Sequence, residues 1–261
     1  MRLSPPHAAP QRAHTLALTC LALSALWVAS GGAEARGGEG ALVTLRDPIG
    51  GVTHVWTPPG YSHKTAGVVV YVHGYNSSAD HSWREFELKR QLKESRQNAL
   101  FVVPDSPSRN ADPVRWASLS DLRTHLTRHG VRLPSGPWVA VGHSGAYRTL
   151  IGWVEAPELS QLILLDALYG GQGELTRFME REGTRLILLS AGTARASRRF
   201  ISDFPYARRV KEMPADLSGF TRRERQARLL YIRSRHDHRA IVSSGEVIPT
   251  LLRLTPLRLI R

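Results

Sequence analysis

At residues 138–147 the sequence reads WVAVGHSGAY, an apolar run that ends at a serine set among small residues. The run predicts a buried strand, and the pattern that follows Ser144 predicts a helix. A serine at such a strand-to-helix turn adopts a strained backbone, so only small residues fit two positions to either side, where this chain has Gly142 and Ala146. The strain lifts the hydroxyl clear of the sheet, and the helix N-terminus favours negative charge that develops there. Ser144 is therefore the candidate nucleophile.

On both sides of this turn, short apolar runs alternate with longer helical patterns. The run VVVYV at 68–72 is apolar without alternation, which is typical of strands covered on both faces of a mostly parallel sheet. The pattern predicts a doubly wound α/β domain whose first two strands form an antiparallel hairpin at the edge. The stretch 191–228 has room for a small lid as well as a helix. We expect strands at 42–46, 52–57, 67–73, 100–104, 138–142, 161–166, 185–190 and 229–233, and helices at 80–96, 119–129, 144–155, 174–181, 221–228 and 245–254.

The first 35 residues have the three regions of a Sec-type signal peptide. A mildly basic start precedes the apolar run LALTCLALSALWV at 16–28, and Ala33-Glu34-Ala35 fits the cleavage site. The run is shorter than the roughly 20 residues that a membrane span needs, although retention as an anchor stays open. We therefore expect residues 1–35 to direct export to the periplasm or the medium, and 36–261 to form a single domain.

The composition is that of a globular protein with a real core, because 42% of the residues are hydrophobic and 22% are charged. The only cysteine is Cys20, which lies within the predicted signal peptide. After cleavage the chain would have no disulfide, no thiol nucleophile and no cysteine ligand for a metal.

The chain has a net charge of +13, supplied mainly by arginine. Arginines cluster at 195–199, 208–209 and 222–228. Export makes nucleic acid an unexpected partner, and an anionic envelope surface is the better candidate. The plainer alternative is a compositional bias toward arginine with no specific ligand. The C-terminal stretch 246–261 allows the same two interpretations, as a membrane contact or as a last helix on the sheet.

Three further segments follow the ends of predicted strands and contain chemically useful residues. They read VHGYN at 72–76, LLDALYG at 164–170 and SRHDHRAIV at 234–242. A carboxylate at the end of a buried strand, such as Asp166, is costly unless it is used or paired. The pair His236 and His238 could also suggest a metal site, but the two are only two residues apart and no third ligand is evident, so we expect no metal there.

From about residue 50 to 255 the chain resembles the α/β-hydrolase superfamily. The resemblance rests on His73-Gly74, on the run Gly142 to Ala146, on Asp166 and on His238. It implies a mostly parallel eight-stranded sheet with helices on both faces, little or no cap domain, a Ser-His-Asp triad, an acyl-enzyme intermediate and no cofactor. The chain departs from the commonest pattern at Ala146 and in the position of the acid.

In this fold the loop after the third strand supplies one oxyanion donor and the residue after the nucleophile supplies the other. The resemblance therefore implies an oxyanion hole formed by the backbone N–H groups of Tyr75 and Gly145. His73 is expected to brace the loop rather than to take part in catalysis. Asn76 and Ser77 could line the pocket, and we expect Asp80 to cap the next helix.

The triad order implied by the fold is serine, acid and then histidine, with the histidine after the last strand. His236 and His238 both satisfy this rule, and we favour His238 because it stands directly before a run that leads into the last helix. For the acid we favour Asp166 over Asp203. The more usual position is one strand later, where the sequence reads Ala-Gly-Thr-Ala-Arg and offers no acid before Asp203. Asp105 is expected to be structural or to line the pocket.

Together these features predict an exported, esterase-like or lipase-like serine hydrolase that cleaves small-molecule or lipid-like carboxylic esters or amides without a cofactor. Two alternatives remain: an amidase or peptidase acting on cell-envelope material, and an inactive α/β-hydrolase-like protein that binds the envelope. The sequence predicts no oligomeric state. Five aromatic residues are candidates for an apolar substrate pocket, namely Tyr75, Trp83, Trp116, Tyr147 and Tyr169.

Overall fold

The computed structural model describes residues 39–48 and 50–260 of the chain. The predicted signal peptide at 1–35 lies outside the described residues. Within the described part, no helix is both long enough and apolar enough to cross a membrane.

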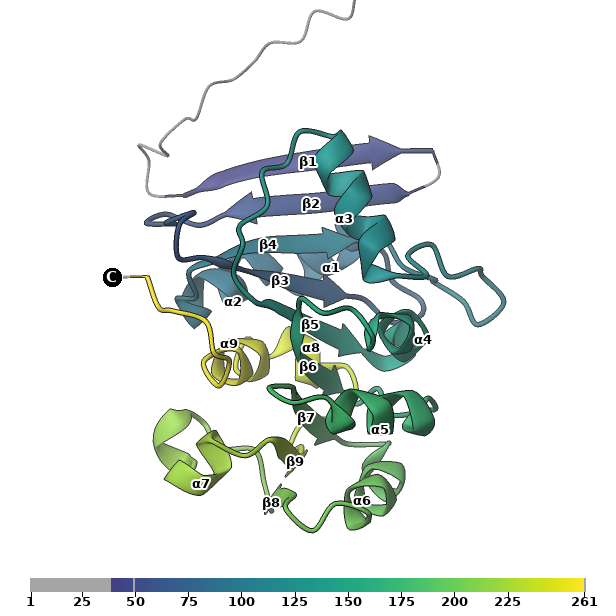
Figure 1. Ribbon diagram of the computed structural model, residues 1–261, viewed down its shortest axis with the longest axis vertical. Helices are drawn as coiled ribbons and strands as arrows, with labels where there is room; N and C mark the ends of the chain where they lie inside the picture. Colours follow the sequence, from purple (N-terminus) through teal and green to yellow (C-terminus); the bar gives the residue numbers. More distant parts are fainter. Residues whose placement is uncertain (1–38, 49, 261) are drawn as a thin grey trace, which may run out of the picture. The chain divides into compact units, whose positions relative to one another are not determined.

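The centre of the domain is one mostly parallel β-sheet (Figure 1). Its order is β1-β2-β4-β3-β5-β6-β7-β9-β8, in which β1 and β2 form the antiparallel hairpin expected at the edge and β2 is also antiparallel to β4. All other neighbours are parallel. The strands are β1 (Ala41–Asp47), β2 (Gly51–Thr57), β3 (Gly67–Val72), β4 (Ala99–Pro104), β5 (Trp138–His143), β6 (Leu159–Leu165), β7 (Arg185–Ser190), β8 (Arg208–Val210) and β9 (Leu229–Arg233).

The described residues thus form nine strands where eight were expected. The additional strand is β8, which has three residues and pairs with β9 at the far edge. Two of its residues are exposed arginines, so it has no apolar run that a sequence pattern could detect. The other eight strands agree with the predicted positions to within a few residues.

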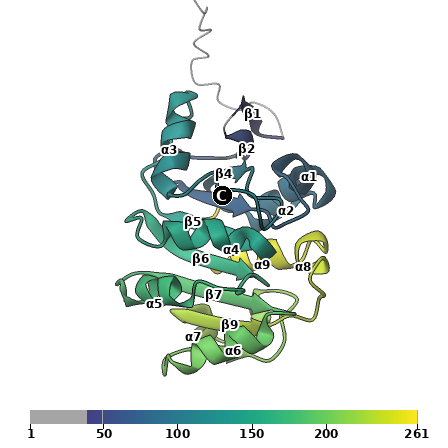
Figure 2. The same cartoon turned by 90° about the vertical axis from the view of Figure 1, so that its right-hand side faces the viewer.

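Helices cover both faces of the sheet because its inner strands are apolar on both sides. β3, β4 and β5 are buried along their whole length. One apolar cluster contains residues from α3, α5 and α6, and the cluster on the opposite face contains residues from α2, α8 and α9. In Figure 2, α3 and α5 accordingly lie on the opposite side of the sheet from α1 and α8. The helices are α1 (Ala79–Glu85), α2 (Leu88–Ser95), α3 (Leu119–Arg128), α4 (Tyr147–Leu150), α5 (Gln172–Glu180), α6 (Ala194–Ser202), α7 (Arg222–Arg225), α8 (Ala240–Ser243) and α9 (Val247–Leu252).

The helix expected at 80–96 is divided into α1 and α2. Glu87, between them, has a φ of 47°, and a left-handed residue interrupts the helical hydrogen bonds. The N-cap of α1 is Ser78, whose side chain accepts a hydrogen bond from the N–H of His81, so the expectation that Asp80 caps this helix is wrong. Asp80 instead pairs with the ring of His54 at 2.7 Å.

The stretch 191–228 adds to the layers of the domain rather than forming a lid. Phe200 and Ile201 of α6 join the core on one face, and Val210 of β8 joins the core on the other. All six residues of α9 are buried, which confirms that this part of the C-terminal stretch packs as a last helix.

Candidate active site

Ser144 stands at a sharp turn directly after β5. It has a φ of 53°, in the left-handed region that a residue with a side chain rarely adopts. A β-carbon at Gly142 would come within 2.3 Å of the Leu150 side chain, and Ala146 is buried beside it. The turn is therefore the strained, tightly packed one that the sequence predicted, and it leaves Ser144 partly exposed.

The loop after β3 lies against this turn. A β-carbon at Gly74 would come within 2.7 Å of the Cβ of Ser144 and 3.4 Å of the backbone nitrogen of Gly145, so only glycine allows this approach. The ring of Tyr75, the next residue, packs over Gly145. The structure thus brings together the two segments expected to supply the oxyanion donors.

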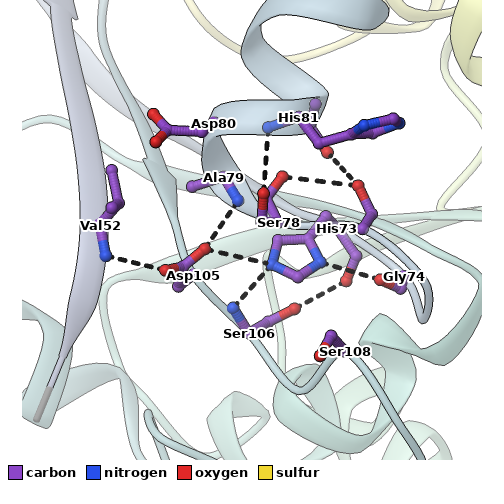
Figure 3. Close-up of polar contacts among 12 residues, drawn as sticks. Val52, His73, Gly74, Ser78, Ala79, Asp80, His81, Asp105, Ser106 and Ser108 are labelled. Atoms are coloured by element: carbon purple, nitrogen blue, oxygen red, sulfur yellow. Dashed lines mark hydrogen bonds and ion pairs between the residues drawn. The ribbon is translucent and has the colours of Figure 1, made fainter.

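A buried histidine holds the base of this loop (Figure 3). The side chain of His73 is 1% exposed, and its Nδ1–H donates to the carbonyl of Gly74 at 2.8 Å. Its Nε2 accepts from the N–H of Ser106 at 2.9 Å, and the Ser106 hydroxyl donates back to the His73 carbonyl at 2.8 Å. These bonds fix the neutral tautomer with hydrogen on Nδ1, and they confirm that His73 braces the loop.

Asp105, which follows β4, ties three segments together in the same view (Figure 3). Its carboxylate accepts from the N–H of Ala79 at 2.7 Å and from the N–H of Val52 at 2.8 Å, and it lies 3.7 Å from the His73 ring. Burial acts to raise the pKa of Asp105, but the hydrogen bonds from the N–H groups of Ala79 and Val52 outweigh it and lower the pKa. The structural role expected for Asp105 is confirmed.

Asp166 follows β6 and is fully buried. Its carboxylate accepts hydrogen bonds from the N–H groups of Ala191, Gly192 and Thr193 and from the Thr193 hydroxyl, at 2.7 to 3.0 Å. It also accepts from Nδ1 of His238 at 2.7 Å. Burial acts to raise the pKa of Asp166, but the bonds from His238 and Thr193 and then from Gly192 outweigh it and hold the pKa well below its usual range.

The departure from the usual acid position has a structural reason. The loop after β7, Ala191 to Thr193, has no carboxylate and instead supplies the donors that hold Asp166 from the neighbouring strand. Asp203 is exposed at the C-cap of α6. The structure therefore brings Asp166, and not Asp203, to the histidine.

The two histidines of the 234–242 segment have different surroundings. His238 lies in the loop between β9 and α8, and its side chain is 43% exposed. Its Nδ1 is bound to Asp166, so Nε2 is the ring nitrogen that takes no part in this bond. His236 instead lies 3.3 Å from Glu246. Within the described part of the chain, the Ser144 hydroxyl contacts Tyr169, and no direct hydrogen bond joins it to His238. Such bonds are often long before substrate binds.

His143, directly before Ser144, links the serine turn to the His238 loop. Its Nε2–H donates to the backbone carbonyl of His238 at 2.9 Å, and the two rings lie 4.5 Å apart. Burial and then the neighbouring His238 lower the pKa of His143 to about 4, so it acts as a neutral donor at ordinary pH. Sequence reasoning did not single out this residue, although its place in the Gly-His-Ser-Gly-Ala motif was a signal.

The five aromatic candidates fall into two groups. Tyr75, Tyr147 and Tyr169 surround the serine turn, with the last two 6.2 Å apart, and the Tyr169 hydroxyl hydrogen-bonds to Ser144. Trp83 stacks on His54, and Trp116 is buried and donates to the backbone carbonyl of Asp105. The two tryptophans therefore support the structure around the site and do not line it.

A hollow of about 760 Å³ lies beside Asp166 and Tyr169, between α5 and α6. Thr193, which holds the Asp166 carboxylate, contributes to its wall. Arg195 and Arg199 make one side of it cationic, and Leu168 and Phe200 supply apolar surface. This is the space next to the site in which a substrate side group could lie.

Solved structures with a similar fold are known. The fluorophosphonate-binding serine hydrolase FphF from Staphylococcus aureus, with substrate bound, is 13% identical with a TM-score of 0.55, and the match covers 83% of this chain and 99% of that one. A feruloyl esterase module from Clostridium thermocellum complexed with sinapinate is 11% identical, with a TM-score of 0.54, covering 82% and 88%. A predicted CIB-like hydrolase from Thermoplasma acidophilum is 14% identical, with a TM-score of 0.51, covering 81% and 96%.

No family model matches the sequence, and no curated protein matches it significantly. With identities this low, the similarity concerns the fold.

The Asp105 network gives a pH-dependent test of stability. Because the pKa of Asp105 is lowered on folding, its carboxylate contributes stability above pH 4 that is lost as the pH falls toward 2. At pH 7 we expect Asp105→Asn to lower the free energy of unfolding by about 1–3 kcal/mol, through loss of charge-assisted hydrogen bonds. Urea titrations from pH 7 to pH 2.5 should show that the difference in free energy of unfolding between wild type and variant becomes smaller below about pH 4.5. A difference in free energy of unfolding that does not change with pH would contradict this role. The exposed control Asp203→Asn should change the free energy of unfolding by less than about 0.5 kcal/mol.

Proposed function

Because this chain has the α/β-hydrolase fold, we propose that it is a serine hydrolase that cleaves carboxylic esters, with Ser144 as nucleophile, His238 as general base and Asp166 as the acid. The observation that carries the proposal is the 2.7 Å bond between His238 and the buried carboxylate of Asp166, next to the strained Ser144 turn. A histidine oriented by a carboxylate beside an exposed serine turn is the arrangement that activates a hydroxyl.

The reaction proceeds through two half-reactions. Nε2 of His238 takes the proton of Ser144 as the serine oxygen attacks the carbonyl carbon, and Asp166 stabilises the imidazolium that forms. The oxyanion accepts hydrogen bonds from the N–H groups of Tyr75 and Gly145. His238 then protonates the departing alcohol, which leaves an acyl group on Ser144. Water, deprotonated by His238, attacks that acyl group, and His238 passes the proton to the departing Ser144 oxygen as the acid is released.

The surroundings of Asp166 suit this role. Its carboxylate is buried, yet four donors besides His238 keep it ionised, so its charge is present when His238 accepts a proton. Burial removes water that would screen this charge. The backbone N–H groups also fix its orientation, which in turn fixes the ring of His238.

The substrate class is an extension of the proposal. The hollow beside the site has apolar walls and three charged side chains, Arg195, Arg199 and Asp203, so its lining carries a net positive charge. The feruloyl esterase module of similar fold binds sinapinate. We therefore propose that suitable substrates include small esters of aromatic or negatively charged acids, and a substrate panel should contain both.

Export through residues 1–35 and contact with an anionic envelope surface also stay proposals, supported by the signal-peptide pattern and the net charge of +13. Fractionation of cells that express the full chain tests the first: recovery only in the cytosol would contradict export. Pelleting with anionic and neutral vesicles tests the second, and equal binding to both would contradict it.

The nucleophile can be tested by covalent labelling. A fluorophosphonate probe should label the wild-type chain and should not label Ser144→Ala, because the probe traps an activated serine. Ser202→Ala, which changes an exposed serine on α6, is the matched control and should label normally. No labelling of wild type, or equal labelling of Ser144→Ala, would favour the inactive envelope-binding alternative. Paired ester and anilide substrates then separate an esterase from an amidase or peptidase.

The acid can be tested by two matched substitutions. We expect Asp166→Asn to lower kcat by about 10³- to 10⁴-fold, because the amide neither stabilises the imidazolium nor selects the productive tautomer. Asp203→Asn should keep kcat within about two-fold of wild type, because Asp203 is exposed and does not contact His238; since it lines the hollow beside the site, any effect should fall on KM. Steady-state ester hydrolysis is the measurement, and a larger loss in Asp203→Asn would show that the acid is wrongly assigned.

His143 is a positioning residue in this mechanism, because it holds the backbone of the His238 loop. We expect His143→Ala to lower kcat by about 5- to 10-fold, the worth of one hydrogen bond, with KM little changed. His143→Gln should restore most of the activity, since its amide can donate from a similar position. Because the pKa of His143 is about 4, the loss should be constant from pH 6 to 9. A purely structural role would instead leave His143→Gln as impaired as His143→Ala.

A further inference from the structure

Three side chains of the types that commonly bind metal ions lie together away from the serine turn, between the β1–β2 hairpin and α3. Asp47 is the last residue of β1, His125 lies within α3, and His129 is the C-cap residue of the same helix. One ligand atom from each of the three side chains lies within 4.8 Å of the other two. The cluster lines a hollow of about 370 Å³ that also contains Trp116.

The two histidines are four residues apart on one helix, so they project from the same face. Nδ1–H of His129 donates to the backbone carbonyl of His125 at 2.9 Å. This bond leaves the lone pair of His129 on Nε2, the nitrogen that points away from the helix backbone. Metal-binding histidines usually donate one ring N–H to a carbonyl and bind the ion through the other ring nitrogen.

The ring of His125 gives an independent sign that a partner belongs here. The residue is 9% exposed, its ring packs 5.0 Å from Trp116, and its buried Nε2 has no hydrogen-bond partner in the described part of the chain. An unpaired buried polar group is costly, and such groups are rare in folded proteins.

We infer that Asp47, His125 and His129 form a binding site for a divalent transition-metal ion, with Zn²⁺ as the best match. Two imidazoles and one carboxylate suit Zn²⁺, whereas Mg²⁺ and Ca²⁺ prefer oxygen ligands alone. Three protein ligands leave a fourth position for water or an anion. Arg115 and Arg128 line the same hollow, and their charge favours an anion there.

Binding requires a small closure of the cluster. Ligand atoms around a tetrahedral Zn²⁺ lie about 3.4 Å apart, so two ligand atoms at the 4.8 Å limit must come about 1.4 Å closer. His129 is exposed and can rotate. The N–H of Gly50 donates to Oδ1 of Asp47 at 2.7 Å and orients the carboxylate.

The bound ion would join the turn of the edge hairpin to the last turn of α3. β1 is largely exposed and pairs only with β2, so few other contacts hold its end. An ion that binds the folded chain and not the unfolded one raises the melting temperature, and the increase grows with the logarithm of the ion concentration above Kd. The site is separate from the serine turn, so metal binding is measured without any assay of hydrolysis.

The test uses the full chain, without a polyhistidine tag, freed of metal by a chelator. Titration with Zn²⁺ against a chromophoric chelator should show one ion per chain, and Co²⁺ should give the intense visible absorption of a tetrahedral site. His129→Ala and Asp47→Asn should each weaken binding at least about 10²-fold, because even residues that only orient a ligand are worth 10- to 100-fold. The control His63→Ala removes a histidine near Tyr61, outside the cluster, and should bind normally.

A measurement on the wild-type chain keeps the test independent of how the variants fold. Diethyl pyrocarbonate modification, followed by mass spectrometry, should show that Zn²⁺ protects the exposed His129 but not His63. Absence of binding by wild type, binding that survives both ligand substitutions, or protection at His236 and His238 instead would overturn the assignment.

Discussion

Two carboxylates at the carboxyl end of the sheet, one fully buried and one partly buried, must be surrounded by hydrogen-bond donors, and the loops of the candidate active site are arranged around that need. Removing an ionised carboxylate from water is costly unless it is paired and hydrogen-bonded. Asp166 is fully buried and receives donors from the loop after β7 and from His238. The loop after β7 and the loop after β9 are thereby fixed relative to each other by one side chain.

Asp105 does the same on the other side of the serine turn. In the strand order, β4 and β6 lie on either side of the pair β3 and β5, whose ends supply Gly74 and Ser144. Asp105 fixes the start of α1 and the hairpin strand β2 through two backbone N–H groups, and His73 joins this network to the oxyanion loop. One carboxylate therefore supports the loop proposed to supply an oxyanion donor, and the other supports the histidine proposed as the base. In both carboxylates, hydrogen bonds from surrounding donors outweigh the effect of burial and lower the pKa.

The proposed metal site applies the same principle at the edge of the sheet, where burial is weaker. An edge strand is held from one side only, and β1 has few buried residues to fix its end. An ion shared by Asp47, His125 and His129 would supply the missing connection. The H-x₃-H spacing of the two histidines is visible in the sequence within the predicted helix 119–129, but Asp47 is 78 positions away from His125 and joins them only through the fold.

The sequence by itself determined the sheet, the serine turn and the histidine that the structure pairs with an acid. Apolar runs such as VVVYV are local, and the small residues around Ser144 are required by the backbone of a tight turn, so both could be read from neighbouring positions. The tertiary structure decided what depends on distant segments. It chose Asp166 over Asp203 because N–H groups from the loop after β7 hold that carboxylate, and it gave His143 a bond to a loop 95 residues away. It also formed β8, since three residues with two exposed arginines become a strand only when β9 supplies the hydrogen bonds.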